Sequence, residues 1–404
     1  MVKYEDNQPE KWYIKEHTKV KHEILKLYLR PWGKILGSRN KRLIILDGFA
    51  GRGEYFENGQ TVVCGSPMIF MDLNTNFLIE ELICICIEKN VENYDNLSKV
   101  LKEKKNELTK KNSNLLLEII ELKKIHNTNI DLLIEHIPQK KYNSSNEKQS
   151  SQKTSVILIN DEFSNVIELL LDNISTNKVT LAPLFCFIDP FGFRGIPLNI
   201  IKKILSLPYT EVLFTFMARD INRFHALKQE EQSLAELFGN KEWKKAIKKK
   251  GEESFLYFYK KTLKDNGIKF VIYFKMFESN RMGVIYYLIH ASNNLKAVEL
   301  MKERMKRISM DFTYFGPDNN KLGNEQIRLT YGYDEFGNNL CEVYRGKNVT
   351  FDKLREQTID SNSFIEKEYR AIIKKLEKEK KVVITRIDSV KSGLKRNDII
   401  NFLS

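Results

Sequence analysis

Leu43-Ile44-Ile45-Leu46-Asp47-Gly48-Phe49-Ala50-Gly51-Arg52-Gly53-Glu54-Tyr55 is the stretch of sequence from which the fold can be predicted. Four consecutive apolar residues open it, and such a run predicts a parallel strand buried on both faces. An acid ends the strand, and three glycines follow within six residues. Glycine allows a sharp turn and a close approach of the backbone to a ligand, which the N–H groups of the following helix can then bind. The stretch therefore predicts a cofactor site, with a ligand-free βα turn as the alternative.

The order of the acid and the glycines indicates the kind of cofactor. A dinucleotide fingerprint reads G-x-G-x-x-G and places its acid about twenty residues later. Here the acid comes first and the glycine spacing is G-x-x-G-x-G. This order resembles the first motif of class I methyltransferases that use S-adenosylmethionine. The resemblance implies that Asp47 lies near the methionine end of that cofactor and that Gly48, Phe49, Gly51 and Gly53 pass beneath it.

The composition favours a water-soluble protein with a polyanionic partner. The 404 residues are 42% hydrophobic and carry a net charge of +13, and a basic surface suits nucleic acid because phosphate contacts release counterions. A lysine- and asparagine-rich composition is also what an AT-rich genome produces. No run of eighteen apolar residues exists and the N-terminus is polar, so we expect no membrane segment, no signal peptide and a cytoplasmic location.

The cysteines predict neither a zinc site nor a disulfide framework, because no C-x-x-C pair occurs. Three of the five (Cys84, Cys86 and Cys186) lie in apolar runs and are expected to be small buried hydrophobes. We therefore expect no resident metal.

Four further strands are predicted after the glycine turn. Leu82–Ile87 ends at Glu88, which is expected to bind the ribose hydroxyls from the carboxyl end of its strand, with an N-cap or a surface acid as the alternative. Val156–Asn160 is followed by Asp161, and the methyltransferase resemblance places that residue near the adenine ring. Between these strands, Leu115–Ile137 is interpreted as a helix and residues 138–154 as a polar insertion. Strands at 184–188 and 211–216 continue the pattern.

The second strong motif is Asp189-Pro190-Phe191-Gly192-Phe193-Arg194, directly after the strand at 184–188. Strands one and four flank the switch point of a doubly wound sheet, so Asp47 and Asp189 should face one crevice. An acid, a proline and an aromatic ring resemble the Asp/Asn-Pro-Pro-aromatic motif of amino-directed nucleobase methyltransferases. That resemblance implies catalytic roles for Asp189, Pro190 and Phe191, with the ring stacked on a flipped base. We expect the nearby Arg194 to hold a phosphate. The second proline of that motif is absent, and a simple turn before the helix at 197–206 is the alternative.

The remainder predicts two further parts. Residues 228–265 read as a basic, aromatic helical insertion, and the strands at 269–277 and 282–291 as the antiparallel sixth and seventh strands, followed by a helix at 293–310. Residues 311–340 are predicted to be a linker with a short embedded element. Beyond it, a helix at 351–357, a basic helix at 363–380, a strand at 382–385 and a basic turn suggest a winged helix-turn-helix, with a protein-docking domain as the alternative. Its recognition helix would present Lys367, Arg370, Lys374 and Lys375.

With these motifs placed, the chain resembles the three-Cys-motif partner proteins over roughly residues 12–310. The carriers of the resemblance are Asp-Gly-Phe-Ala-Gly-x-Gly, Gly-Ser-Pro and Ile-Asp-Pro-Phe-Gly. These bacterial and phage proteins have a methyltransferase-like domain, are tied to a separate three-cysteine, radical-SAM-like protein, and in some members carry a winged-helix extension associated with mobile defence elements. The resemblance implies such a partner and a phage-defence context.

The sequence thus predicts an α/β protein with a seven-stranded Rossmann-like methyltransferase domain (residues 1–310), a linker (311–340) and a winged-helix-like domain (341–404). The expected function is S-adenosylmethionine-dependent methyl transfer on or with nucleic acid. Two alternatives stay open. One is a non-catalytic scaffold that binds the partner protein. The other is a metal-dependent nuclease that uses Asp47, Glu88 and Asp189.

Overall fold

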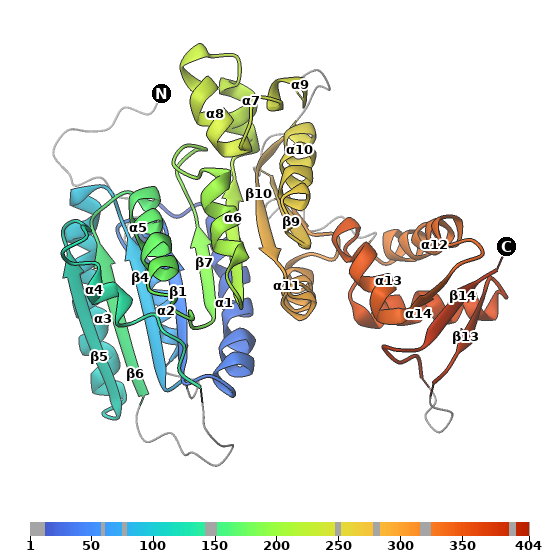
Figure 1. Cartoon of the computed structure of the whole chain (residues 1–404), viewed down its shortest axis with the longest axis horizontal. Coiled ribbons are helices and arrows are strands. Elements are labelled where there is room, and N and C mark those ends of the chain that lie inside the picture. The colour runs from blue at the N-terminus through green and yellow to red at the C-terminus, as the bar shows by residue number, and fades with distance from the viewer. Residues whose placement is uncertain are drawn as a thin grey trace.

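The computed structural model describes residues 13–57, 61–74, 79–141, 152–246, 252–277, 283–315, 325–387 and 393–403. Within these ranges a nine-stranded mixed sheet forms the centre of the molecule, in the order β11-β9-β10-β8-β7-β1-β4-β6-β5 (Figure 1). Its strands are β1 (Arg42–Asp47), β4 (Glu81–Ile87), β5 (Leu115–Leu122), β6 (Gln152–Ile159), β7 (Leu184–Ile188), β8 (Thr210–Phe216), β9 (Phe270–Phe277), β10 (Val284–Ser292) and β11 (Thr313–Tyr314). A separate hairpin, β2 (Glu54–Glu57) and β3 (Thr61–Cys64), follows the glycine turn.

The strand order is that of a doubly wound, Rossmann-like sheet. Strands β5, β6, β4, β1, β7 and β8 are parallel, and the chain first builds outward from β1 through β4 and then outward from β7 through β8. The order reverses between β1 and β7, where ligands bind in open α/β sheets. β10 runs antiparallel to both β8 and β9, so the predicted antiparallel pair is present.

Helices cover both faces of the sheet (Figure 1). One face packs against α1 (Glu16–Gly37), α2 (Ser66–Leu73), α3 (Val91–Lys111) and α11 (Leu295–Ile308). The other packs against α4 (Asp131–Ile134), α5 (Phe163–Thr176), α6 (Leu198–Ser206), α7 (Ala218–Phe224), α8 (Glu231–Phe238), α9 (Trp243–Ala246) and α10 (Glu252–Asp265). The apolar stripe of α1 (Leu25, Tyr28, Leu29 and Trp32) is buried, and so are Cys84, Cys86 and Cys186, as predicted.

Two predictions about the sheet are wrong. The sheet has nine strands in the described residues rather than seven, because Leu115–Leu122 is the edge strand β5 and not a helix, and Thr313–Tyr314 pairs with β9. Strand β6 begins at Gln152, inside the predicted polar insertion, of which residues 142–151 lie outside the described residues. Pairing with β5 extends β6 into this polar stretch, since ladder hydrogen bonds satisfy the backbone whatever the side chains are. The position of an edge strand such as β5, and the length of the strand that pairs with it, therefore become clear only from the tertiary structure.

Ser66 does not cap α2, although serine is a favoured N-cap residue. Gly65 precedes α2 as its N-cap, and Ser66 lies within the helix with Pro67 beside it. The Ser66 hydroxyl instead donates a hydrogen bond of 2.6 Å to Asp47 Oδ2. A buried carboxylate needs a hydrogen-bond donor, so the Ser66 hydroxyl is directed to Asp47 and not to the backbone at the start of α2.

The C-terminal residues form a second, smaller unit. Its order is α12 (Glu325–Val343), β12 (Asn348–Thr350), α13 (Phe351–Thr358), α14 (Glu366–Lys378), β13 (Val382–Thr385) and β14 (Ile399–Phe402), with β12 and β13 both antiparallel to β14. Helix α12 occupies part of the stretch predicted to be a linker. Thr350 caps α13, accepting a 3.3 Å hydrogen bond from the Lys353 N–H.

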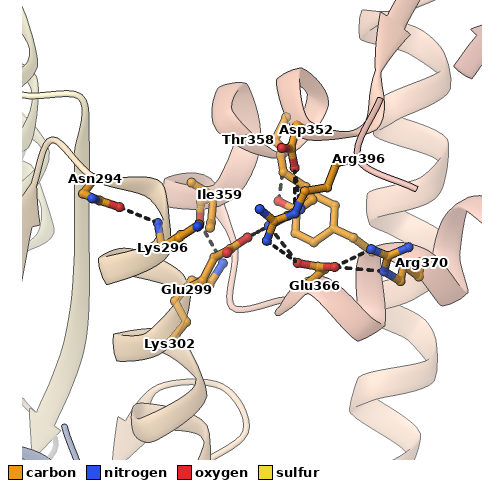
Figure 2. Close-up of polar contacts among 12 residues, drawn as sticks. Asn294, Lys296, Glu299, Lys302, Asp352, Thr358, Ile359, Glu366, Arg370 and Arg396 are labelled. Carbon is orange, nitrogen blue, oxygen red and sulfur yellow. Dashed lines mark hydrogen bonds and ion pairs between the residues drawn. The ribbon is translucent and has the colours of Figure 1, made fainter. Parts of the chain in front are cut away.

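This unit is attached to α11 through buried polar contacts (Figure 2). Lys302 on α11 is fully buried, and its ammonium donates to the Ile359 carbonyl at 2.7 Å. Arg355 on α13 is buried between Glu299 of α11, Asp352 and Glu366. Because removing one partner leaves a buried charge uncompensated, the network favours one arrangement of the two units.

Candidate functional site

Four acids lie at or just beyond the carboxyl ends of parallel strands, on one edge of the sheet. Asp47 ends β1, while Glu88, Asp161 and Asp189 follow β4, β6 and β7 closely. Carboxyl ends of parallel strands share an edge, so the structure brings these predicted site residues together. Their surroundings differ, and those surroundings decide what each carboxylate can do.

Asp47 lies beneath the glycine turn with 0% of its surface exposed. Its Oδ2 accepts from the Ser66 hydroxyl at 2.6 Å, and its Oδ1 accepts from the Phe49 N–H at 3.2 Å. Burial raises the pKa of Asp47 to about 7 against the effect of these hydrogen bonds, and the nearby Asp189 and Glu88 raise it further. Asp47 therefore holds the turn and α2 together, and its carboxylate does not reach the surface.

The glycines of the turn differ in why a larger residue would not fit. Gly51 and Gly53 have φ values of +63° and +86°, in the left-handed region that favours glycine. A Cβ on Gly48 would lie 2.6 Å from the Phe163 ring, so that glycine is required by packing. A Cβ on Gly51 would meet nothing within 4 Å. Gly51 is thus the point where the turn faces open space.

Glu88 binds the glycine turn itself. Its Oε2 accepts from the Gly51 N–H at 2.8 Å and its Oε1 from the Asn90 N–H at 2.7 Å. Burial raises the pKa of Glu88, and these two hydrogen bonds, together with one from the Asn93 side chain, oppose the rise. Each carboxylate oxygen has a second lone pair. Glu88 can therefore still accept from a ribose hydroxyl without releasing the turn.

Asp161 ties two loops together beyond the ends of β5 and β6. Its Oδ1 accepts from the Glu162 N–H at 2.7 Å, and its Oδ2 accepts from the Ile125 N–H at 3.3 Å. A cavity of about 580 Å³ opens beside this turn, with Tyr94 and Asn160 among its lining residues. Asp161 itself does not line that cavity, so the structure shows a loop-holding carboxylate at this position.

Asp189 is the acid that faces a large cavity. Its Oδ1 accepts from the Thr215 hydroxyl at 2.6 Å, and its Oδ2 forms an ion pair with Lys21 of α1. Burial opposes ionisation, but the charge of Lys21 and the hydrogen bonds from Lys21 and Thr215 hold the pKa of Asp189 below its usual range. Asp189 is therefore an ionised hydrogen-bond acceptor at neutral pH.

The cavity has a volume of about 710 Å³ and lies over the ends of β7, β8 and β10. Aromatic and cationic side chains line much of it, including Tyr13, Lys15, His17, Tyr55, Phe191, Arg194, Arg219, Phe224 and Tyr286. Phe191 is 76% exposed, as a ring must be if it is to stack on a ligand. Aromatic faces beside cations are what single-stranded nucleic-acid sites combine.

Several predicted cations already have acidic partners. Arg194 forms a two-point ion pair with the buried carboxylate of Glu230, with Nε to Oε2 at 3.0 Å. Arg370 pairs with Glu366, and Lys375 with Asp334. Lys367 and Lys374 are exposed on α14, and Lys378 shares their face at helical spacing. These three lysines have no ion pair among the described residues.

The part of the chain that the structure describes contains no group of three or more His, Cys, Asp or Glu side chains placed to hold a metal ion. The acids of the nuclease alternative have other partners: Asp47 has Ser66, and Asp189 has Lys21. In the same described part, no helix is long and apolar enough to cross a membrane.

Lys21, Thr215 and Tyr286 surround Asp189 in the cavity. The sequence alone offers His17, Lys21 and His22 as residues at the mouth of a cleft, with a solvated helix face as the alternative, and it does not single out Thr215 or Tyr286. A signal for Lys21 exists, since it lies at i, i+4, i+7 and i+11 with Leu25, Tyr28 and Trp32. A lysine on an apolar helical face needs a buried anion. Thr215 and Tyr286 lie in uniformly buried strands, where no local pattern distinguishes them.

Comparison with known proteins leaves the family open. No protein-family model matches the chain, and no curated protein matches its sequence. Among solved structures, protein LPL1258 from Legionella pneumophila, with the family model DUF519, is similar over 73% of this chain and 92% of its own, at 12% identity and a TM-score of 0.40. Trm1 from Pyrococcus horikoshii, solved with S-adenosyl-L-methionine, is similar over 96% and 91%, at 9% identity and a TM-score of 0.34. The strand order of the sheet defines the fold as doubly wound and Rossmann-like.

Proposed function

We propose that this protein is a methyltransferase of class I type that takes S-adenosylmethionine at the β1–β4 edge and an amine-bearing nucleobase in the cavity over β7 and β8. The observation that carries the proposal is the ionised Asp189 facing a cavity with an exposed Phe191. An acceptor beside a stacking ring is what orients an exocyclic amine. Positioning and electrostatic stabilisation are the contributions that such a group makes to transfer.

The residues at the glycine turn fit the cofactor in part. Gly51 faces open space, and Glu88 retains lone pairs at the carboxyl end of β4. Asp47 is buried, so its proposed contribution is to hold the turn in shape rather than to touch the cofactor. S-adenosylmethionine supplies an electrophilic methyl group when bound, and this chain supplies the surface that presents the acceptor.

The direct test of this assignment is calorimetry with S-adenosylmethionine followed by a methyl-transfer assay on single-stranded DNA and RNA. Asp47→Ala should weaken cofactor binding because the turn loses its support. Asp189→Ala should abolish transfer and leave cofactor affinity within a few-fold. No heat with the wild-type protein, or full transfer by Asp189→Ala, would refute the assignment.

For the C-terminal unit we propose a winged helix that contacts nucleic acid through the exposed lysines of α14. Its order of helices and antiparallel strands supports this. Because Arg370 and Lys375 are paired with acids, we propose contacts to the phosphate backbone by Lys367, Lys374 and Lys378. Such contacts predict an affinity that falls steeply with salt and depends little on sequence.

A non-catalytic scaffold is the second candidate, and one observation favours it. The carboxylates of Asp47 and Glu88 bind the protein's own turn, so both acids at the cofactor edge already have a structural role without a cofactor. In this case the resemblance to three-Cys-motif partner proteins would imply a radical-SAM-like partner in a defence setting. A stable stoichiometric complex recovered by co-purification, together with no methyl transfer to any substrate, would support the scaffold.

A further inference from the structure

Lys21 and Asp189 form a pair whose two members are buried to different degrees. The side chain of Lys21 is 6% exposed and that of Asp189 is 20% exposed. The ammonium also lies 5.6 Å from the centre of the Tyr286 ring, and the Tyr286 hydroxyl donates to the His17 carbonyl at 3.1 Å. Lys21 is therefore fixed deeper than the carboxylate, and part of the carboxylate stays open to the cavity.

The pairing leaves Asp189 with free acceptor capacity. One hydrogen bond comes from Lys21 to Oδ2 and one from Thr215 to Oδ1. An ionised carboxylate offers about four lone-pair sites, so about two remain for a ligand. An incoming N–H donor can use them without displacing Lys21.

Lys21 also sets the charge of the site. The titratable groups coupled most closely to Asp189 are Lys21 and His22 from α1, Asp47 from β1, Tyr55 from β2 and Tyr286 from β10. Further charged or titratable side chains line the same cavity, namely Lys15, His17, Arg194, Arg219, Asp220 and Glu230. Burial, followed by the charge of Lys21, lowers the pKa of His22 to about 3, so that imidazole is neutral at physiological pH. Lys21 lies in direct contact with Asp189, and its positive charge keeps this partly buried carboxylate ionised next to Asp47.

We propose that Lys21 is a positioning residue that holds Asp189 as a permanent hydrogen-bond acceptor, so that the cavity selects nucleobases with an exocyclic amine over bases with a carbonyl at the same place. The selection rests on the proposed function of the cavity. A carbonyl oxygen set against an ionised carboxylate leaves both acceptors unsatisfied, and sites built for a donor reject such analogues strongly. Adenine and hypoxanthine differ at this position and have nearly the same shape.

The first experiment needs no ligand. The side-chain carboxyl carbon of Asp189 is followed by ¹³C NMR from pH 4 to pH 9 in a background carrying Asp47→Asn, so that the two acids do not titrate together. Asp189 should stay ionised down to low pH in the parent protein and in Lys21→Arg. In Lys21→Met its midpoint should rise by at least about one pH unit, the lower end of what a neighbouring opposite charge provides. An unchanged midpoint in Lys21→Met would overturn the positioning role.

The second experiment measures selection. Fluorescence anisotropy compares two labelled single-stranded oligonucleotides, identical except for one adenine or one hypoxanthine among abasic sites. The parent protein should favour adenine by about tenfold or more, the scale of one well-made base contact. The ratio should fall toward one in Lys21→Met below the midpoint that the NMR titration gives for Asp189 in that variant, and it should recover as the pH rises through that midpoint and Asp189 ionises. Lys21→Arg should keep it, and Asp189→Ala should lose it at every pH.

The two experiments separate the possible failures. A full adenine preference retained by Lys21→Met below the Asp189 midpoint of that variant would overturn the inference, since a lysine with only a structural role would change stability and not the ratio. If the parent protein binds neither oligonucleotide, the proposed function and the selection fail together. The NMR titration still decides the positioning role in that case.

Discussion

Asp47→Asn should make the protein more stable at alkaline pH than the wild type. The carboxylate is fully buried and its pKa is raised from the ordinary 3.8 to about 7, chiefly by burial. Between these two values the folded state holds a proton that the unfolded state has lost, so the stability of the wild type falls as the pH rises. Asparagine has nearly the same shape. Its carbonyl oxygen can accept from the Phe49 N–H, and its amide can donate to the Ser66 hydroxyl.

The magnitude follows from the linkage relation. Because the pKa is raised from 3.8 to about 7, the free energy of unfolding above pH 7 is about 4 kcal/mol lower than at a pH where both states are protonated. About 3 kcal/mol of this free energy of unfolding is lost between pH 5 and pH 8. The difference in unfolding free energy between Asp47→Asn and the wild type should therefore grow by about this amount over that range. Any loss from weaker neutral hydrogen bonds is the same at both pH values and cancels.

Urea unfolding followed by circular dichroism at pH 5, 6, 7 and 8 measures this difference. Ser66→Ala is the matched control, because it removes a hydrogen bond that lowers the pKa of Asp47 and should steepen the pH dependence. A constant difference between Asp47→Asn and the wild type from pH 5 to pH 8 would show that Asp47 titrates normally. Burial would then not raise the pKa of Asp47 in the folded protein.

Three further predictions concern the sites. Phe191→Ala should weaken binding of a single-stranded oligonucleotide by about 1–3 kcal/mol if the exposed ring stacks on a base, and equal affinities in anisotropy would rule out stacking. Replacing Lys374 and Lys378 by Glu should flatten the slope of log affinity against log salt, by about one for each phosphate that a lysine no longer neutralises; an unchanged slope would assign α14 to another role. Arg355→Met should destabilise the C-terminal unit by about 3–5 kcal/mol, because Glu299 and Glu366 keep charges without their partner. Protease sensitivity of residues 325–403 equal to that of the wild type would contradict the last prediction.

Much of the sheet follows from the sequence because buried parallel strands are local apolar runs. Leu43–Leu46, Leu82–Ile87 and Leu184–Ile188 each read as a strand, and each lies in the central sheet. The acids after these strands could also be placed, since parallel strands bring their carboxyl ends to one edge. Edge strand β5 is the exception, because its pattern of Leu, Ile and Glu fits a helix as well as a strand.

Local sequence patterns are enough to predict a doubly wound α/β protein with a glycine turn after its first strand and acids along one edge, because each of these features depends on short-range spacing. The roles of those acids depend instead on partners that tertiary packing brings to them. Asp47 and Asp189 both follow buried strands, yet one holds a turn and the other faces a cavity, because the first meets Ser66 and the second meets Lys21 from a helix 168 residues earlier in the chain. A carboxylate's pKa and free lone pairs depend on such distant partners, and sequence spacing does not encode them.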